Sequence, residues 1–149
     1  CTGEQMAGAM AMGASGAWCA SVFLTTSEAE TSEVVKEKML AATSKETVRS
    51  RSRTGKHSRQ LQSDWTDAWE SDGAPEPLPM PIQTMVSEPA LDKINKAAEV
   101  DHEGAKKLAT YWVGQGIGLV DEKITAGQTV QKFKEEFIEA YERLNNFME

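Results

Sequence analysis

The first 24 residues combine helical spacing with a continuous apolar run. Residues 3–12 place Met6 and Ala9 on one face of small side chains, which predicts a short, tightly packed helix. Two glycines within residues 13–16 end that pattern. Residues 17–24 (AWCASVFL) are mostly apolar without alternation, which is typical of a strand buried on both faces of a sheet. The sequence therefore predicts a helix followed by an interior strand.

A second helix is predicted directly after this strand. Residues 25–28 (TTSE) supply capping hydroxyls and an acidic first turn. The helical stripe that follows contains Val34, Val35, Lys38, Met39 and Ala42. A strand with a helix on each side is the repeating pattern of a parallel sheet. We therefore predict an α/β fold for this part of the chain.

The pattern changes in the middle third of the chain. Residues 47–53 alternate like an exposed strand, and residues 54–56 (TGK) predict a turn. Residues 58–69 fit a short helix that places Trp65 and Trp69 four residues apart. We interpret these two tryptophans as packing residues and not as part of a cofactor site.

The rest of the sequence predicts a proline-rich loop followed by helices. Residues 71–81 contain four of the five prolines, so we expect an extended surface loop without helix. Helices are predicted from Glu88 onward, with Pro89 in a first turn and a further helical segment at 105–113. The clearest pattern is that of the C-terminal helix, whose apolar stripe comprises Val130, Phe133, Phe137, Tyr141, Leu144 and Met148.

The single interior strand has no partner of comparable quality elsewhere in the sequence. Such a strand needs neighbours on both sides, because each buried backbone group left unpaired costs roughly 1–3 kcal/mol. We therefore expect an incomplete piece, and the start at Cys1 without an initiator Met supports this expectation. The predicted organisation is the last sheet elements at 1–43, a strand, short helix and proline-rich loop at 44–88, and helices at 89–149.

Net charge and cysteine content argue against several function classes. A formal charge of −7 argues against a nucleic-acid partner, because phosphate neutralisation needs an excess of Lys and Arg. No apolar run approaches the roughly 20 residues of a membrane span, and the first residues lack the features of a signal peptide. Two cysteines without a Cys or His at ligand spacing predict reduced thiols and no metal site. We expect a cytoplasmic protein.

One basic segment departs from this acidic average. Arg49, Arg51 and Arg53 alternate with serines, so a strand would place all three side chains on one face. We interpret that face as a solvated sheet edge, which its charges protect from pairing with other strands. An anion-binding patch is the alternative.

A series of short segments, in order along the chain, carries a family resemblance. The segments are 2–7 (TGEQMA), 11–14, 16–25 (GAWCASVFLT), 36–38 with 40–43, 47–51, 54–56 with Arg59, and 114–119 (GQGIGL). Together they resemble the C-terminal region of the nitronate monooxygenase family, formerly called 2-nitropropane dioxygenases. The resemblance implies part of an FMN-dependent (β/α)8 TIM barrel, with a mostly helical C-terminal extension, that oxidises alkyl nitronates with O2.

The same resemblance implies where a flavin phosphate would bind. In the family, backbone amides at the ends of the last two barrel strands hold the phosphate. The second of these positions corresponds to Trp18, Cys19, Ala20 and Ser21, and the first, a Gly-Gly turn, would directly precede Cys1. Ala20 stands where the family has Gly, which matters if that position needs a positive φ. Ser21 keeps a hydroxyl where the family has Thr.

The glycine run at 114–118 is the second candidate part of the site. In the family this run lies near the flavin, so Gln115 is a candidate neighbour of the active site. The structural alternative is a set of glycines that end or kink a packed helix. The family's catalytic histidine would precede Cys1, and we expect His57 and His102 to be ordinary surface residues. No catalytic residue is therefore assigned within the chain.

Two other functions stay open beside the nitronate oxygenase. An FMN-dependent barrel of the enoyl-acyl-carrier reductase type shares these late motifs. A non-catalytic helical fragment is the other alternative, because the catalytic half would be missing from this chain. Under the oxygenase hypothesis this piece alone would be inactive, and its partners would be the missing N-terminal barrel half, a small nitronate substrate and O2.

Overall fold

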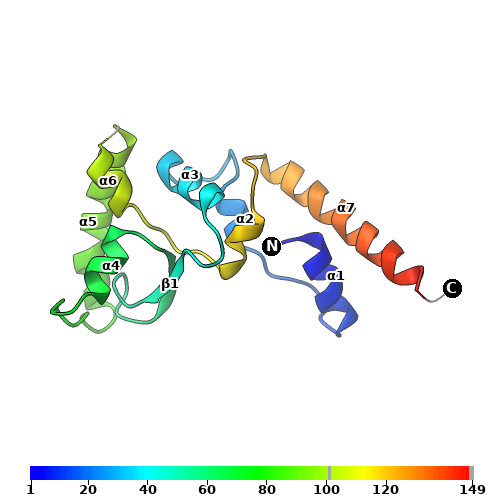
Figure 1. Ribbon diagram of the computed structural model, residues 1–149, viewed down its shortest axis with the longest axis horizontal. Helices are drawn as coiled ribbons and strands as arrows, with labels where there is room; N and C mark the ends of the chain where they lie inside the picture. The colour runs from blue at the N-terminus through cyan, green and yellow to red at the C-terminus, as the bar shows by residue number, and fades with distance from the viewer. Residues whose placement is uncertain (101, 148–149) are drawn as a thin grey trace.

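The computed structural model describes residues 1–100 and 102–147 of an elongated, mainly helical molecule (Figure 1). The elements are α1 (Gly3–Ala11), α2 (Ser21–Leu24), α3 (Glu33–Ala41), β1 (Thr47–Ser50), β2 (Ser58–Leu61), α4 (Asp64–Glu70), α5 (Ile82–Glu99), α6 (Glu103–Leu108), the 3-10 helix η1 (Gln115–Leu119) and α7 (Ala126–Asn145). Helices α1 and α7 form one end of the molecule, and α4, α5 and α6 form the other. Among the described residues, no helix is both long and apolar enough to cross a bilayer.

The predicted first and last helices are confirmed, and they pack against each other. Thr2 is the N-cap residue of α1 and Thr125 is the N-cap residue of α7, and each is part of a capping box. The two helices approach closely at Gly3, where an added Cβ would collide with the carbonyl oxygen of Phe133. The Gly3 N–H donates to Glu136 Oε2 at 2.6 Å. Met148, the last residue of the predicted stripe, lies outside the described residues.

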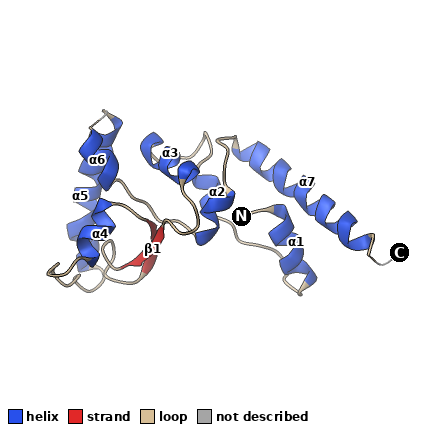
Figure 2. Ribbon diagram, in the orientation of Figure 1, coloured by secondary structure: helices blue, strands red, loops and turns tan. Residues whose placement is uncertain are grey.

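The predicted interior strand is wrong for this chain. Residues 17–20 have no regular secondary structure, and Ser21 begins α2. Trp18 is fully exposed. An interior strand needs ladder partners on both sides, and the only sheet in the described residues is the antiparallel hairpin of β1 and β2 (Figure 2). Without a parallel sheet, the backbone at Phe23 bonds locally instead, with its N–H donating to the Ala20 carbonyl at 2.9 Å.

The second helix starts later than the sequence predicts. The hydroxyls of Thr25 and Thr26 donate to the Val22 and Phe23 carbonyls, so they close α2 and do not begin the next helix. Helix α3 starts at Glu33. Its predicted stripe is confirmed at Val34, Val35 and Met39, which are buried in the core together with Leu61, Ala109, Val113 and Ile117.

The second strand of the hairpin occupies residues that were predicted to begin a helix. Residues 58–61 pair antiparallel with β1 and do not belong to the following helix, and the predicted turn is confirmed with Gly55 at φ 81°. The predicted helix at 105–113 ends at Leu108, because the Leu61 N–H donates to the Tyr111 carbonyl at 3.0 Å. Long-range pairing therefore overrides the local helical pattern in two segments. Residues 58–61 form β2 itself, and residues 109–113 lie beside it.

The proline-rich segment at 71–81 lacks helix, as predicted, but α5 begins seven residues before Pro89. Pro89 therefore lies inside the helix and not in its first turn. Two buried side chains hold the early turns of α5 against the hairpin loop. Gln83 Nε2 donates to the Ser52 carbonyl at 2.7 Å, and Ser87 Oγ donates to the Arg53 carbonyl at 2.6 Å.

Trp65 and Trp69, which we interpreted as packing residues, are both partly buried, and their ring centroids lie 6.0 Å apart. The expectation of a solvated basic face is wrong for Arg53. Its guanidinium is buried, pairs with Glu88 through two bonds of 2.7 and 3.1 Å, and lies 3.8 Å from the centroid of the Trp112 ring. Arg49 is exposed, as expected.

Candidate functional site

Three segments that are far apart in the sequence meet at the start of α2. The Gly114 N–H donates to Ser21 Oγ at 2.7 Å, across 93 positions of sequence. Beside this bond, a Cβ added to Gly116 would lie 2.7 Å from Cys1 Sγ. We refer to Cys1, Ser21, Gly114, Gln115 and Gly116 as the Ser21–Gly114 cluster. It combines the residues just before α1, the start of α2 and the glycine run.

Ser21 occupies a buried position at the junction between residues 17–20 and α2. Ala20, the N-cap residue, has φ −124° and ψ −56°, and its side chain makes no capping bond. The first N–H groups of a helix have no acceptor within the helix. A φ of −124° is open to any L-residue, so Ala in place of Gly causes no backbone strain here.

The other residues that were predicted to hold the phosphate are less connected to the cluster than Ser21 is. The Trp18 side chain is fully exposed, and the Cys19 side chain packs partly buried against the core. Ala20 is exposed. Of the four residues assigned to the phosphate position, only Ser21 has a long-range hydrogen bond to another part of the candidate site.

Gln115 begins η1 with an exposed side chain, directly after Gly114. The glycine run does not end or kink a helix, because the preceding residues 109–113 lie alongside β2. The glycines instead permit close approach, since a Cβ on Gly118 would lie 2.6 Å from the backbone nitrogen of Ser44. Ile117 anchors the run in the core and is completely buried. Cys1 was not identified as a site residue from the sequence, and Gly114 was included only as part of the glycine run.

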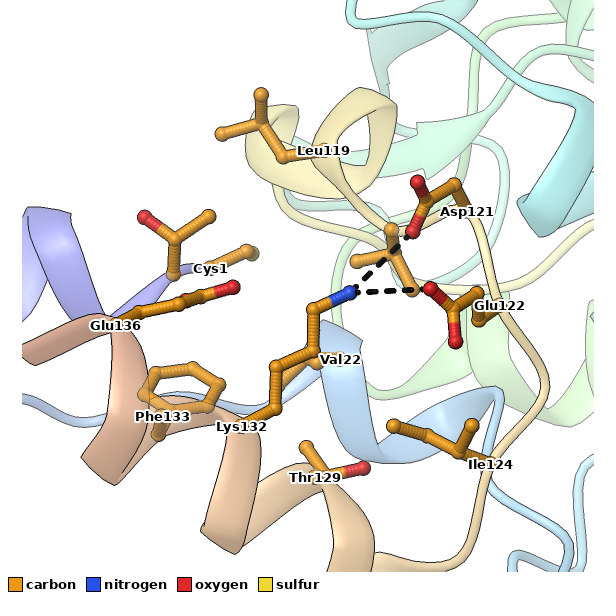
Figure 3. Close-up of a pocket in the computed structure, with 12 residues that line it drawn as sticks. Cys1, Val22, Leu119, Asp121, Glu122, Ile124, Thr129, Lys132, Phe133 and Glu136 are labelled. Carbon is orange, nitrogen blue, oxygen red and sulfur yellow. Dashed lines mark hydrogen bonds and ion pairs between the residues drawn. The ribbon is translucent and has the colours of Figure 1, made fainter. Parts of the chain in front are cut away.

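A small pocket lies beside the cluster, between α2 and α7 (Figure 3). Its volume of about 30 Å³ has room for about one water molecule and none for a flavin. Figure 3 shows the Lys132 ammonium directed at Asp121 and Glu122, at 3.6 and 3.5 Å. Burial disfavours the charged amine, but these carboxylates and Glu136 outweigh it and raise the pKa of Lys132. The charged side chains that line this pocket therefore pair with one another.

Both histidines are surface residues away from the cluster, as predicted. His57 is exposed beside the proline-rich loop. His102 is the N-cap residue of α6, where its Nδ1 accepts from the Ala105 N–H at 3.2 Å. Within residues 1–100 and 102–147, no three His, Cys, Asp or Glu side chains gather in a way that could hold a metal ion.

The order and spacing of these segments match a known family. The family model for nitronate monooxygenase covers residues 1–136 of this chain. The chain belongs to the nitronate monooxygenase family. This match confirms the resemblance found in the sequence, and it includes every residue of the Ser21–Gly114 cluster.

Relatives of this nitronate monooxygenase family member are longer than the chain. The "Putative monooxygenase Rv1533" of Mycobacterium tuberculosis is 50% identical over 148 residues, which are 99% of this chain and 39% of that protein. A nitroalkane oxidase structure from Streptomyces ansochromogenes matches with a TM-score of 0.79 and 24% identity, over 96% of this chain and 38% of that one. FabK from Thermotoga maritima matches with a TM-score of 0.71 and 27% identity, over 98% and 44%.

The chain thus spans about two fifths of the length of these proteins. The two structural matches extend over nearly all of the chain, so the arrangement of its helices around the cluster is shared with solved enzyme structures.

Proposed function

We propose that the protein containing this chain is an FMN-dependent oxidoreductase that oxidises alkyl nitronates with O2. The chain would supply the last elements of its (β/α)8 barrel and part of its flavin site. The observation that carries the proposal is the hydrogen bond between Gly114 and Ser21. It joins the two segments that the family resemblance independently assigns to the phosphate and to the flavin.

The residues at the cluster fit a flavin phosphate. Ser21 Oγ accepts from the Gly114 N–H, and its own proton stays available for a phosphate oxygen. The backbone N–H groups of Ser21 and Val22 would add donors, since no side chain caps α2. Ala20 tolerates this geometry without a positive φ. When bound, FMN would supply the electron-transfer chemistry, while Gln115 would lie on the flavin side of the glycine run.

Residues 17–20 suit pairing with strands of a longer protein. Trp18 is fully exposed, and these four residues have no secondary structure of their own. In the parent barrel, neighbouring strands from the N-terminal half would cover Trp18 and give the backbone its ladder partners. We therefore expect the 149-residue chain alone to bind little FMN and to be inactive.

The test is a chimera in which this chain replaces the matching part of the Mycobacterium tuberculosis relative, which is 39% of that protein. The purified chimera is expected to carry FMN, seen in its absorbance spectrum and identified after release. It should consume O2 when an alkyl nitronate is added. A chimera that folds but stays colourless with added FMN contradicts the proposal.

Variants at the cluster locate the phosphate within that chimera. Ser21→Ala is expected to weaken FMN binding about tenfold, corresponding to about 1.4 kcal/mol for a lost hydrogen bond to a charged group. Ser21→Thr keeps the hydroxyl and should bind FMN normally. Ala20→Gly should change the affinity little, because φ is −124°. Ser71→Ala, at an exposed serine after α4, is the matched control.

An FMN-dependent reductase of the enoyl-acyl-carrier type is the second candidate function, because that type of barrel shares the late glycine motif at 114–119. Both candidates require the same phosphate site, so FMN binding does not separate them. Substrate does. Turnover of an enoyl thioester with a nicotinamide reductant, and none of a nitronate with O2, would favour the reductase.

A further inference from the structure

Trp112 is a large aromatic side chain that stays partly open at the edge of the core. It is 37% exposed, although its neighbours Ala109 and Val113 are 0% and 5% exposed. Single exposed apolar side chains are common on protein surfaces, so this exposure alone indicates no function. What distinguishes Trp112 is its position beside the candidate site and the way in which its ring is held.

Trp112 lies close to the Ser21–Gly114 cluster along the chain. Its Cα atom is two peptide units from that of Gly114, so the two Cα atoms are at most about 7.6 Å apart. Gly114 is fixed in turn by the bond from its N–H to Ser21 Oγ at 2.7 Å. Gln115 follows directly, and its side chain is exposed. The side chain of Trp112 can therefore reach a molecule that binds beside the cluster.

Both the backbone and the ring of Trp112 are fixed, in contrast to a typical exposed side chain. An isolated β-bridge joins the backbone of Trp112 to Gln60 of β2. Arg53 Cζ lies 3.8 Å from the ring centroid, and the Tyr111 ring packs against the indole with 5.6 Å between centroids and an angle of 77°. The part of the ring that these neighbours leave open is thus a fixed surface, which loses little conformational entropy when a ligand binds.

The need for strand partners that explains the exposure of Trp18 does not apply to Trp112. Residues 17–20 have no regular secondary structure, and under the proposed function strands of the longer protein would cover them. Residues 109–113 already have backbone bonds to β2. The open ring surface of Trp112 is therefore available to a small molecule at the site.

We infer that Trp112 determines substrate specificity, because its open ring surface contacts the alkyl chain of the nitronate. This inference rests on the proposed function and narrows the substrate class to nitronates with an extended apolar chain. An indole offers a flat apolar surface, and burying methylene groups against it favours binding in proportion to the area covered. Short substrates, whose atoms all lie at the reacting end, gain little from this contact.

Turnover of two nitronates by the chimera with the Mycobacterium tuberculosis relative tests the inference. The wild-type chimera is expected to have a higher kcat/KM for the nitronate of nitrohexane than for that of nitroethane. Trp112→Ala should lower kcat/KM for the nitrohexane substrate about tenfold, mainly by raising KM, because the lost contact is the same in the ground and transition states. The value for the nitroethane substrate should change little.

Two further variants accompany Trp112→Ala. Trp112→Phe keeps a ring beside Arg53, so it should fold normally and lower kcat/KM for the nitrohexane substrate only about twofold, in line with its smaller apolar surface. Phe147→Ala removes an aromatic side chain that is 84% exposed just beyond the end of α7, and this control should leave both substrates unaffected. If Trp112→Ala does not fold, the ratio measured for Trp112→Phe decides, and an unchanged ratio overturns the inference.

The role of Trp112 and the proposed function fail in different ways. A chimera that stays colourless, or that oxidises neither nitronate, contradicts the proposed function and the role of Trp112 with it. A yellow, active chimera in which Trp112→Ala lowers kcat/KM equally for both substrates, or for neither, leaves the proposed function standing and overturns only the role of Trp112. FMN affinity should be unchanged in Trp112→Ala, because the phosphate position at Ser21 does not include residue 112.

Discussion

Arg53 illustrates how a single residue acquires its role only in the folded chain. As part of a basic alternation it resembled Arg49 and Arg51, yet its side chain is 4% exposed. Glu88 pairs with it through both carboxylate oxygens, and the Trp112 ring stacks on its guanidinium. The planar guanidinium of Arg can form two bonds to Glu88 and also lie over the Trp112 ring, whereas the ammonium of Lys cannot do both. Arg53 therefore fastens α5 to the segment beside β2.

The substitution Arg53→Lys should lower the free energy of unfolding by about 1–3 kcal/mol. The loss arises because Lys keeps the charge but cannot form both bonds to Glu88 or stack flat on Trp112. Urea unfolding measures it. Arg49→Lys, at an exposed position on β1, is the control and should change stability by less than about 0.5 kcal/mol. Equal effects at the two positions would contradict the role given to Arg53.

At the scale of elements, close packing of α1 on α7 depends on glycine in a way that helix propensity alone does not show. Both Gly3 and Gly8 lie in α1, where Ala would be the better helix former. A Cβ on Gly3 would meet the backbone of α7 at Phe133, whereas a Cβ on Gly8 would meet nothing within 4 Å. The same change therefore has opposite consequences at two positions of one helix.

Gly3→Ala should destabilise the protein by about 1–3 kcal/mol, because the collision is with backbone that cannot rotate away. Gly8→Ala should stabilise it by up to about 1 kcal/mol through helix propensity. Thermal unfolding followed by circular dichroism measures both variants. The interpretation of the α1–α7 contact is wrong if the two substitutions shift the midpoint in the same direction.

At the scale of the whole molecule, short polar bonds tie the loop before α3 to the start of α7. The Ala126 N–H donates to both Glu28 oxygens at 3.1 and 3.0 Å, and the Ser27 N–H donates to the Ile124 carbonyl at 3.2 Å. Glu28 thus caps α7 from 98 positions away. The bond from Ala126 is the main cause that lowers the pKa of Glu28 below its ordinary 4.5.

This cap predicts a pH dependence of stability. A carboxyl whose pKa is lower in the folded state stabilises the fold above its ordinary pKa, and this contribution is lost as the pH falls through the folded pKa. Wild type should therefore be more stable than Glu28→Gln at neutral pH, and the difference should vanish in acid below pH 4.5. Acid titration of urea unfolding measures this. A difference that persists unchanged in acid would exclude the carboxylate cap.

The sequence by itself determined the features that depend on neighbouring residues. The helices α1 and α7, the turn at Gly55 and the helix-free segment at 71–81 follow from caps, periodicity and backbone restrictions, which act within a few positions. The family, and Ser21 as a candidate site residue, were also readable from short segments in order.

Only the tertiary structure decided which distant segments pair. Residues 58–61 form a strand and residues 109–113 lie beside it, although both segments carry helical patterns, because ladder bonds between remote positions outweigh weak local propensity. Residues 17–20 lack such partners in this chain and form no strand. The contact between Gly114 and Ser21 has no local signal at all, since a hydrogen bond across 93 positions exists only once the fold brings its two groups together.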